Sequence, residues 1–356
     1  MMNKGKTGLK ILVILCVFAG AAFAYFHWSG EDAVGAREEM LSRLPGDPTA
    51  VIFVDVAQLR TSPLLEQLFS WAPQVAPDPD YTQFVQATGF HYEKDLERAA
   101  IGVMRQGNNA ATYVAIADGK FDRKKIEAYA ASSGRKETVS GSAIFALNVG
   151  GRGKTSFFTF LRDDRIAWTD DPSYAAILLQ RTVAASPEEW REHFRRLAGT
   201  PLFVVLRQDS GSPSPLAEQA PGGFQSPQLA ALLGQLQWIS IAGKPDGNLL
   251  RVVVDGECLS EQTIKQLNDF LKGVVVLAQM GLSEAKTRKQ LDPQLREGYL
   301  ELLQSADIEK MDRGSSKSVR VVFDVTPELL EAARGAGALA GSGKDAGKQG
   351  SGEKTR

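Results

Sequence analysis

Residues 101–119, IGVMRQGNNAATYVAIADG, decide the expected fold. Apolar stretches at 101–104 and 112–117 flank a short polar turn, and the second stretch ends at Asp118-Gly119. Two apolar stretches joined in this way are typical of a β-hairpin. Because the strands of a hairpin run in opposite directions, this stretch predicts an antiparallel sheet.

The same pattern returns further along the chain, at residues 238–256. Apolar stretches at 238–242 and 249–254 flank a Pro-Asp-Gly turn, and the second stretch again ends in Asp-Gly, at Asp255-Gly256. The recurrence predicts two copies of one structural unit.

A strand and a helix are expected before each hairpin. The β-branched run 50–56 (AVIFVDV) precedes SPLLEQ at 62–67, and 201–206 (PLFVVL) precedes SPLAEQ at 214–219. Serine is a common N-cap, and proline suits the first helical position. Each hairpin is therefore expected to follow the same strand and helix.

An amphipathic helix is expected after each Asp-Gly, around Ile126 in the first copy and from Ser260 in the second. The order strand, helix, hairpin, helix, strand is that of the ferredoxin-like unit. The sequence thus predicts an α+β chain of two tandem split-βαβ (ferredoxin-like) units with antiparallel sheets, preceded by one N-terminal transmembrane or signal helix. The second unit carries a helical insert at 277–304, in which Asp292-Pro293 starts a new helix.

Composition shifts along the chain give the domain boundaries. The last stretch is rich in Gly and Lys and has too few apolar residues to offset the entropy of ordering. The expected organisation is 1–30 signal anchor or signal peptide, 31–43 linker, 44–185 first α+β repeat, 186–199 linker helix, 200–333 second α+β repeat with helical insert, and 334–356 disordered tail.

Residues 11–26, ILVILCVFAGAAFAYF, form an apolar run that follows three lysines. As a helix they would be about 24 Å long, slightly short of the ~30 Å hydrocarbon core of a bilayer. Two interpretations fit this run. It is either a single-span anchor that contacts the membrane through residues 9–28, or a signal peptide cleaved after Ala24 at the Ala22-Phe23-Ala24 site.

Both interpretations place the body of the chain outside the cytoplasm, because the lysines stay on the cytoplasmic side. The anchored form predicts a single-pass protein of the bacterial inner membrane. The cleaved form predicts a secreted or periplasmic protein.

Charge and composition exclude several function classes. The chain has 41 basic and 42 acidic residues, without the positive excess that nucleic-acid binding requires, so no nucleic acid is expected as a partner. Two cysteines, Cys16 and Cys258, do not supply a disulfide framework or a Cys-rich zinc site. The three histidines are far apart in sequence, so no metal and no cofactor are expected.

Known catalytic motifs are incomplete in this sequence. Gly153-Lys154-Thr155 ends like a phosphate-binding loop, but the first glycine of that motif is replaced by Asn148. Two Ser-x-x-Lys pairs, at Ser133 and Ser283, lack the partner motifs of serine acyl-transfer enzymes. We expect no catalytic residue from these patterns.

Five residues are candidates for a shared edge or an interface. Asp118 and Asp255 end equivalent strands, so a pair of carboxylates is conceivable, although Asp-Gly after a strand is also ordinary turn chemistry. Phe157, Phe158 and Phe160 put aromatic rings on both faces of one strand. That pattern predicts a strand covered on both faces, and a peptide-binding sheet edge is the alternative.

Two further motifs carry a resemblance to known proteins. The pattern Leu44-Pro45-x-Asp47-x-x-Ala50 opens the first strand, and Ile166-Ala167-x-x-Asp170-Asp171-Pro172 follows later. In both, the chain resembles uncharacterised bacterial envelope proteins that have an N-terminal span before a domain opening with LPxD. The resemblance implies an extracytoplasmic domain and transfers no catalytic residue.

These observations predict a membrane-tethered extracytoplasmic protein that does not catalyse a reaction. Its expected role is binding or scaffolding in the bacterial envelope, with another envelope protein as its partner. Two alternatives remain: a small-molecule-binding module, and an uncharacterised hydrolase that uses Asp118 or Asp255.

Overall fold

A computed structural model describes residues 33–63, 79–105, 111–139, 141–148, 155–179, 187–208, 227–284, 291–314 and 316–332. The chain divides into two compact units. Unit 1 lies within residues 1–212 and 237–244, and unit 2 lies within residues 213–236 and 245–356. The predicted membrane segment, the two SPLxEQ stretches and the Gly/Lys-rich tail lie outside the described residues, apart from Ser62 and Pro63.

Twelve strands are present among the described residues: β1 (Ala50–Asp55), β2 (Leu96–Arg105), β3 (Ala111–Gly119), β4 (Gly134–Val139), β5 (Ser142–Asn148), β6 (Thr155–Arg162), β7 (Arg165–Thr169), β8 (Leu202–Arg207), β9 (Trp238–Asp246), β10 (Leu249–Cys258), β11 (Asp307–Asp312) and β12 (Lys317–Val325).

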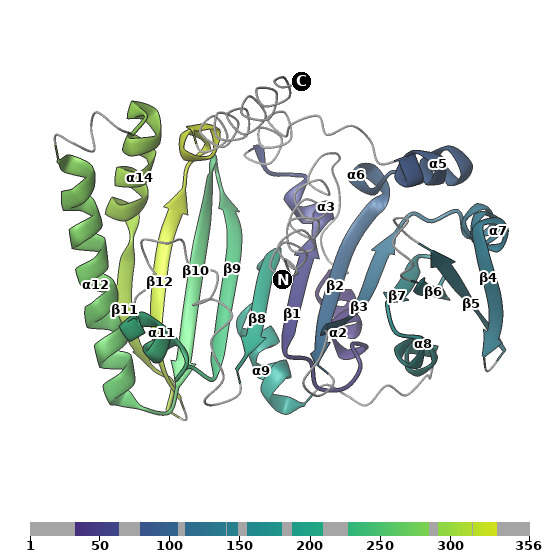
Figure 1. Ribbon diagram of the computed structural model, residues 1–356, viewed down its shortest axis with the longest axis horizontal. Helices are drawn as coiled ribbons and strands as arrows, with labels where there is room; N and C mark the ends of the chain where they lie inside the picture. Colours follow the sequence, from purple (N-terminus) through teal and green to yellow (C-terminus); the bar gives the residue numbers. More distant parts are fainter. Residues whose placement is uncertain are drawn as a thin grey trace, which may run out of the picture. The chain divides into compact units, whose positions relative to one another are not determined.

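These strands form one antiparallel sheet in the order β11-β12-β10-β9-β8-β1-β2-β3-β7-β6-β5-β4 (Figure 1). The predicted fold class, two tandem ferredoxin-like units, is therefore wrong. The predicted hairpin at 101–119 is confirmed, because β2 and β3 pair with Ile101 opposite Ala115. The error lies in how the strands around that hairpin pair.

A ferredoxin-like unit requires its first strand to lie parallel to a later strand of the same unit. Here β1 instead pairs antiparallel with β2 on one side and with β8 on the other. Val51 lies opposite Gly102 in β2 and opposite Val205 in β8. The first strands of the two sequence repeats thus pair with each other, and no separate sheet closes within one repeat.

β1 is a nearly continuous apolar strand because both of its faces are covered. Phe53 is buried and stacks on the ring of Phe203 in β8, with 5.2 Å between ring centroids. The guanidinium of Arg37 lies over both rings, 5.3 Å from the first and 5.0 Å from the second.

Ten helices are assigned among the described residues: α2 (Ala33–Ser42), α3 (Val56–Leu59), α5 (Pro79–Thr88), α6 (Tyr92–Asp95), α7 (Arg123–Ser133), α8 (Pro172–Leu179), α9 (Glu188–Arg196), α11 (Pro227–Leu233), α12 (Glu261–Ser283) and α14 (Pro293–Ser305).

Several helix starts follow the sequence prediction. Ser260 caps α12, since its hydroxyl accepts a hydrogen bond from the amide of Thr263 at 3.2 Å. Asp292 caps α14 in the same way, with Pro293 at the first helical position. α2 forms within the stretch 31–43 that the sequence predicts to be a linker.

An aromatic cluster fills the core of unit 1 beneath α7. Phe145 stacks on Phe158 with 5.1 Å between centroids, and Phe158 packs edge-to-face with Phe160 at 6.4 Å. Ile126 and Ala130 of α7 pack against these rings. The cluster ties β5 and β6 to the helix above them.

α9 packs against β9 in another part of unit 1. Its Trp190 is fully buried and packs edge-to-face on Trp238 of β9, with 4.9 Å between centroids. His193 is also buried, and its ring lies 4.2 Å from the Trp238 ring. The helix is strongly amphipathic, and this places His193 on the apolar side.

No helix in the described parts of the chain is long and apolar enough to cross a membrane.

Candidate functional site

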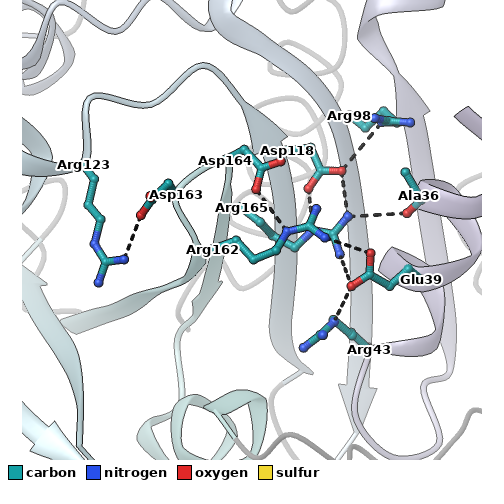
Figure 2. A network of polar contacts seen from close by, with 10 residues as sticks. All are labelled: Ala36, Glu39, Arg43, Arg98, Asp118, Arg123, Arg162, Asp163, Asp164 and Arg165. Atoms are coloured by element: carbon teal, nitrogen blue, oxygen red, sulfur yellow. Dashed lines mark hydrogen bonds and ion pairs between the residues drawn. The ribbon is translucent and has the colours of Figure 1, made fainter. Parts of the chain in front are cut away.

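The two aspartates that the sequence predicts at strand ends are each bound by an arginine of a neighbouring strand, and Asp255 lies inside β10 and not at its end. Asp118 of β3 lies opposite Arg98 of β2 and opposite Arg165 of β7. The Arg165 guanidinium binds it with two hydrogen bonds, from Nε to Oδ1 at 2.5 Å and from Nη2 to Oδ2 at 2.9 Å (Figure 2). Arg98 approaches the same carboxylate at 3.7 Å.

Arg165 and Asp118 form the buried centre of this network. Arg165 is 0 % exposed and Asp118 is 3 % exposed. Such a pair is tolerated in an interior only when hydrogen bonds satisfy both ions. Burial acts to lower the pKa of Arg165, but the hydrogen bonds to Asp118 and the charge of Glu39 raise it above its ordinary value.

α2 covers the pair and adds further contacts to Arg165. Glu39 of α2 forms an ion pair with Arg165, with 3.1 Å between Oε1 and Nη1, and the carbonyl oxygen of Ala36 lies 3.5 Å from Arg165 Nη2 (Figure 2). Arg37 of the same helix donates to the carbonyl oxygen of Phe194 at 3.0 Å. α2 is thus held to Arg165 of β7 by Ala36 and Glu39, and its Arg37 is bonded to α9.

Glu39 gathers three positive charges. Besides Arg165, it pairs with Arg162 at 3.1 Å and with Arg43 at 3.3 Å. Partial burial acts to raise the pKa of its carboxyl, but the three arginines outweigh that effect and hold the pKa below its usual value. Glu39 is therefore held in its ionised form.

Charged residues of the β6–β7 turn continue the network outward. Arg162 binds Asp164 at 3.0 Å, and Asp163 accepts from Arg123 of α7 at 3.0 Å (Figure 2). The Arg123 guanidinium also lies 5.1 Å from the centroid of the Phe160 ring. This outer part is exposed, so water and salt screen its ion pairs.

A second cluster of the same kind lies in unit 2. Asp255 of β10 is opposite Arg320 of β12, which binds it with two hydrogen bonds of 3.1 and 3.0 Å. Arg313 adds a third at 3.1 Å. The clusters of Asp118 and Asp255 lie in different units and have separate arginine partners.

Of the two other aspartates that follow apolar runs, Asp324 is bound by an arginine in the same way and Asp55 caps a helix. Asp324 is opposite Arg251, which binds it at 3.0 and 3.2 Å. Asp55 is opposite Arg98 in the register and caps α3, accepting from the amide of Gln58 at 2.8 Å. Burial raises the pKa of Asp55, and the hydrogen bond and nearby arginines only partly offset this.

The glycines after Asp118 and Asp255 have a different role from the predicted turn. Gly119 ends β3 and Gly256 lies inside β10. A Cβ on Gly119 would lie 2.6 Å from the carbonyl oxygen of Asp95, and one on Gly256 would lie 2.8 Å from Leu236. The carbonyl oxygen of Asp95 requires glycine at 119, whereas at 256 the side chain of Leu236 would have to shift to admit a Cβ.

This arrangement is suited to holding strands together and poorly suited to acid–base chemistry. A general base needs a carboxylate that can reach a substrate proton, yet the oxygens of Asp118 and Asp255 already accept hydrogen bonds from arginines. Among the described residues, no group of three or more His, Cys, Asp and Glu could hold a metal ion.

The phenylalanine candidates lie in β6, which has β5 and β7 as neighbours. Phe158 and Phe160 are buried in the aromatic cluster, and Phe157 is half-buried. The backbone of β6 is therefore not a free sheet edge. An interface role for these side chains stays a prediction.

The Ser-x-x-Lys pairs do not form a catalytic arrangement in the described chain. Ser133 ends α7 and Lys136 lies in β4, with its ammonium over the Phe145 ring at 5.6 Å. Ser283 donates to the carbonyl of Gln279, and its partner Lys286 lies outside the described residues.

Sequence reasoning missed the residues that organise the site: Arg37, Glu39, Arg98, Arg165 and Arg320. The one local signal was Arg165, which directly follows the Asp163-Asp164 turn, whereas Arg98 and Arg320 lie within their strands. Pairing those arginines with the aspartates required the strand register, which the sequence pattern does not supply.

Comparisons with known proteins find similar solved structures at low sequence identity. No protein-family model matches the chain, and no curated protein matches it. Crystal form IV of TP0453 is similar over 85 % of this chain and 99 % of that chain, with 8 % sequence identity and a TM-score of 0.46. Crystal form I of the same protein gives 83 % and 96 % coverage, 8 % identity and a TM-score of 0.44.

Proposed function

We propose that this protein is a membrane-tethered extracytoplasmic protein of the bacterial envelope that binds or scaffolds another envelope protein and does not catalyse a reaction. The tether is the apolar run 11–26, and the described sheet and helices form the body that the tether carries. The resemblance of the Leu44-Pro45-x-Asp47 opening to bacterial envelope proteins supports this placement.

The observation that carries the proposal is the attachment of α2. The helix begins at Ala33, three residues after the uncharged stretch ends at Gly30. Glu39 and the backbone of Ala36 hold α2 to Arg165 of β7, and Arg37 donates to α9. Met40 and Leu41 of the same helix are buried. A body fastened this close to a tether would be held near the membrane, as a scaffold requires.

The pairing of aspartates with arginines across neighbouring strands supports a role without catalysis. Arginine holds Asp118, Asp255 and Asp324 in paired hydrogen bonds. Bidentate pairs of this kind fix geometry and leave few acceptor positions free. They explain the aspartates as parts of the sheet, without the hydrolytic role that the sequence left open.

The two terminal strands offer the free edges of the sheet as described. β4 carries Arg135, Lys136 and Glu137, and β11 carries Glu309 and Lys310 among other charges. Charged residues on an edge strand oppose uncontrolled pairing with other chains. A specific partner would have to match those charges.

The test is cross-linking in intact cells with the full-length chain. A photo-reactive residue at Arg135, whose side chain is 72 % exposed, samples the β4 edge. A matched probe at Asp163, whose side chain is 88 % exposed in a turn, serves as the control for random encounters. We expect one recurrent envelope protein at the β4 probe and none at the control.

Recovery of the chain from the membrane fraction tests the tether in the same cells. A chain found only in the soluble extracytoplasmic fraction would contradict the tether. Identical background at both probes, with no partner after whole-chain cross-linking, would contradict scaffolding and favour the ligand-binding or hydrolytic alternatives.

A further inference from the structure

The outer edge of β4 presents backbone groups to which another chain can bond. β4 is the last strand of the sheet, with β5 on one side and no strand on the other among the residues that the structure describes (Figure 1). Every residue from Gly134 to Thr138 is exposed. An extended segment of another protein can join such an edge through main-chain hydrogen bonds, as an added strand.

The register of the hairpin of β4 and β5 shows which residues face that edge. Val139 lies opposite Ser142, and a two-residue loop joins them. The residues at the two ends of such a loop bond to each other, and bonded positions alternate along an antiparallel pair. Every second residue before Val139 is therefore bonded to β5. The N–H and C=O groups of Gly134, Lys136 and Thr138 point outward instead.

The side chains of β4 carry charge on both faces of the sheet. Arg135 and Glu137 share one face and form an ion pair of 2.7 Å, with side chains 72 % and 45 % exposed. Lys136 is on the other face, and its ammonium lies 5.6 Å from the centroid of the Phe145 ring. Within the described ranges of the chain, no carboxylate pairs with Lys136. A carboxylate on an added strand would supply that partner.

The same charges oppose a second copy of this chain at the β4 edge. Two identical strands that pair antiparallel are related by a two-fold axis, so one residue lies opposite its own copy. If that residue is Arg135, Lys136 or Glu137, two like charges face each other, which is destabilising. A pairing centred on either end of β4 avoids this, but it overlaps only a short part of the strand. The charges of β4 therefore select a different sequence.

We propose that β4 binds an extended segment of the partner protein as an added antiparallel strand, with an acidic residue opposite Lys136. Antiparallel pairing continues the sheet and is the more stable kind. On the other face, charge matching places an acidic residue opposite Arg135 and a basic residue opposite Glu137. From its N-terminus, the partner segment thus carries one basic residue and then two acidic ones. The proposal rests on the proposed function and names the chemistry by which the partner is recognised.

The test is photo-cross-linking in intact cells, with the full-length chain carrying the photo-reactive residue at Arg135. Further substitutions are added to this parent chain one at a time. Thr138→Pro removes an outward N–H without removing a bond to β5, and edge strands accept proline at such positions. Its control, Thr138→Val, keeps that N–H. Lys136→Glu reverses the charge in the middle of β4, and Lys310→Glu makes the same change at an exposed residue of β11 as the control.

We expect Thr138→Pro and Lys136→Glu each to lower the yield of the partner adduct by at least about five-fold, since one removes a main-chain bond and the other opposes the partner's carboxylate. The two controls should stay within about two-fold of the parent chain. An unchanged urea midpoint by tryptophan fluorescence will show that each variant is folded. Lys136→Glu, which leaves the backbone as it is, tests the edge even if proline disturbs the hairpin.

Mass spectrometry of the adduct provides an independent readout. The cross-linked segment of the partner should contain a basic residue followed by two acidic ones. A partner segment without acidic residues would contradict the proposed pairing.

Other results would also overturn the proposal. An adduct that persists unchanged in both Thr138→Pro and Lys136→Glu would reject strand addition and leave the proposed function standing. An adduct between two copies of the chain would assign the edge to self-association. A parent chain that gives no adduct at position 135 would reject the β4 edge, and whole-chain cross-linking would then decide the proposed function separately.

Discussion

The clusters around Asp118 and Asp255 are built alike and buried differently. Each has an aspartate on a hairpin strand opposite an arginine on the next strand. In unit 1 the arginine, Arg165, has no exposed surface and α2 covers it. In unit 2 the side chain of Arg320 is 33 % exposed and that of Arg313 is 19 % exposed.

This difference in exposure shows that a helix lying over a cross-strand ion pair changes how much the pair contributes to stability. Breaking a fully buried pair leaves an uncompensated charge in the interior, which is strongly destabilising. A pair in contact with water is screened and contributes less. The position of α2 therefore predicts that unit 1 depends more on its cluster than unit 2 does.

The tryptophans make this comparison measurable. All five fall within the residue ranges of unit 1: Trp28, Trp71, Trp168, Trp190 and Trp238. Tryptophan fluorescence therefore follows the unfolding of unit 1, while far-ultraviolet circular dichroism follows both units.

The largest effect is expected for Arg165→Met. It leaves Asp118 and Glu39 without their main partner, and the cost of breaking a buried pair is about 3–5 kcal/mol. Urea unfolding followed by tryptophan fluorescence should show an earlier transition. Arg162→Met, at a partly exposed member of the network, is the matched control and should change the midpoint much less. Equal shifts in the two variants would contradict the special role of the buried pair.

A smaller effect is expected for Asp255→Asn in unit 2. The arginines it leaves behind are partly exposed, so the loss should be about 1–2 kcal/mol. Circular dichroism should report the loss, while the tryptophan transition stays in place. A shift of the tryptophan signal by the same amount would show that the two units unfold together.

Glu39→Gln should weaken the hold of α2 in a pH-dependent way. Because three arginines keep the pKa of Glu39 below its ordinary value, its stabilisation is fully present above about pH 4.3, the usual glutamate pKa. It is lost as the pH falls through the lower pKa of the folded chain. At neutral pH the variant should be less stable by about 0.5–1 kcal/mol, after allowance for solvent screening.

Acid titration of stability provides the measurement for Glu39. The difference in free energy of unfolding between the natural chain and Glu39→Gln should shrink as the pH is lowered below about 4.3, the usual pKa of a glutamate. A difference that is constant from neutral to acid pH would argue that the glutamine disturbs packing and not charge.

The smallest effect is expected for Arg251→Met. Its partners, Asp324 and Asp246, are bound on the surface of unit 2, and the Arg251 side chain is 48 % exposed. We expect no resolvable shift of the unfolding midpoint in physiological salt, because exposed pairs are screened. A clear shift there would contradict the ranking by burial.

Local features of this fold were predictable from the sequence, and long-range ones were not. The hairpin of β2 and β3, the Ser260 cap and the start of α14 at Pro293 each depend on neighbouring residues, so their patterns identify them. The pairing of β1 with β8 depends on which apolar strands meet, and β-branched runs such as AVIFVD fit several partners equally well.

The same reasoning explains the candidate site. Asp118 and Asp255 were found because Asp-Gly repeats at equivalent places. Their arginine partners come from strands 47 and 65 positions away in the chain. The spacing of apolar residues along the chain cannot predict that these aspartates and arginines lie side by side. α2 was missed for another reason, since AVGAREEMLS has almost no apolar face and reads as a polar connection.

The pairing of β1 with β8 also sets an order of events during synthesis. Arg37 meets the carbonyl of Phe194 across 157 positions, and Asp47 meets Trp190 across 143. At roughly 5–20 residues per second, α2 and β1 wait about 7–30 s for those partners to be made. Throughout that interval one side of β1 is an apolar edge with no strand beside it, a template for misassembly with another nascent chain. The rate of translation thus determines when the N-terminal half can fold. A chaperone that binds β1 would act during that interval.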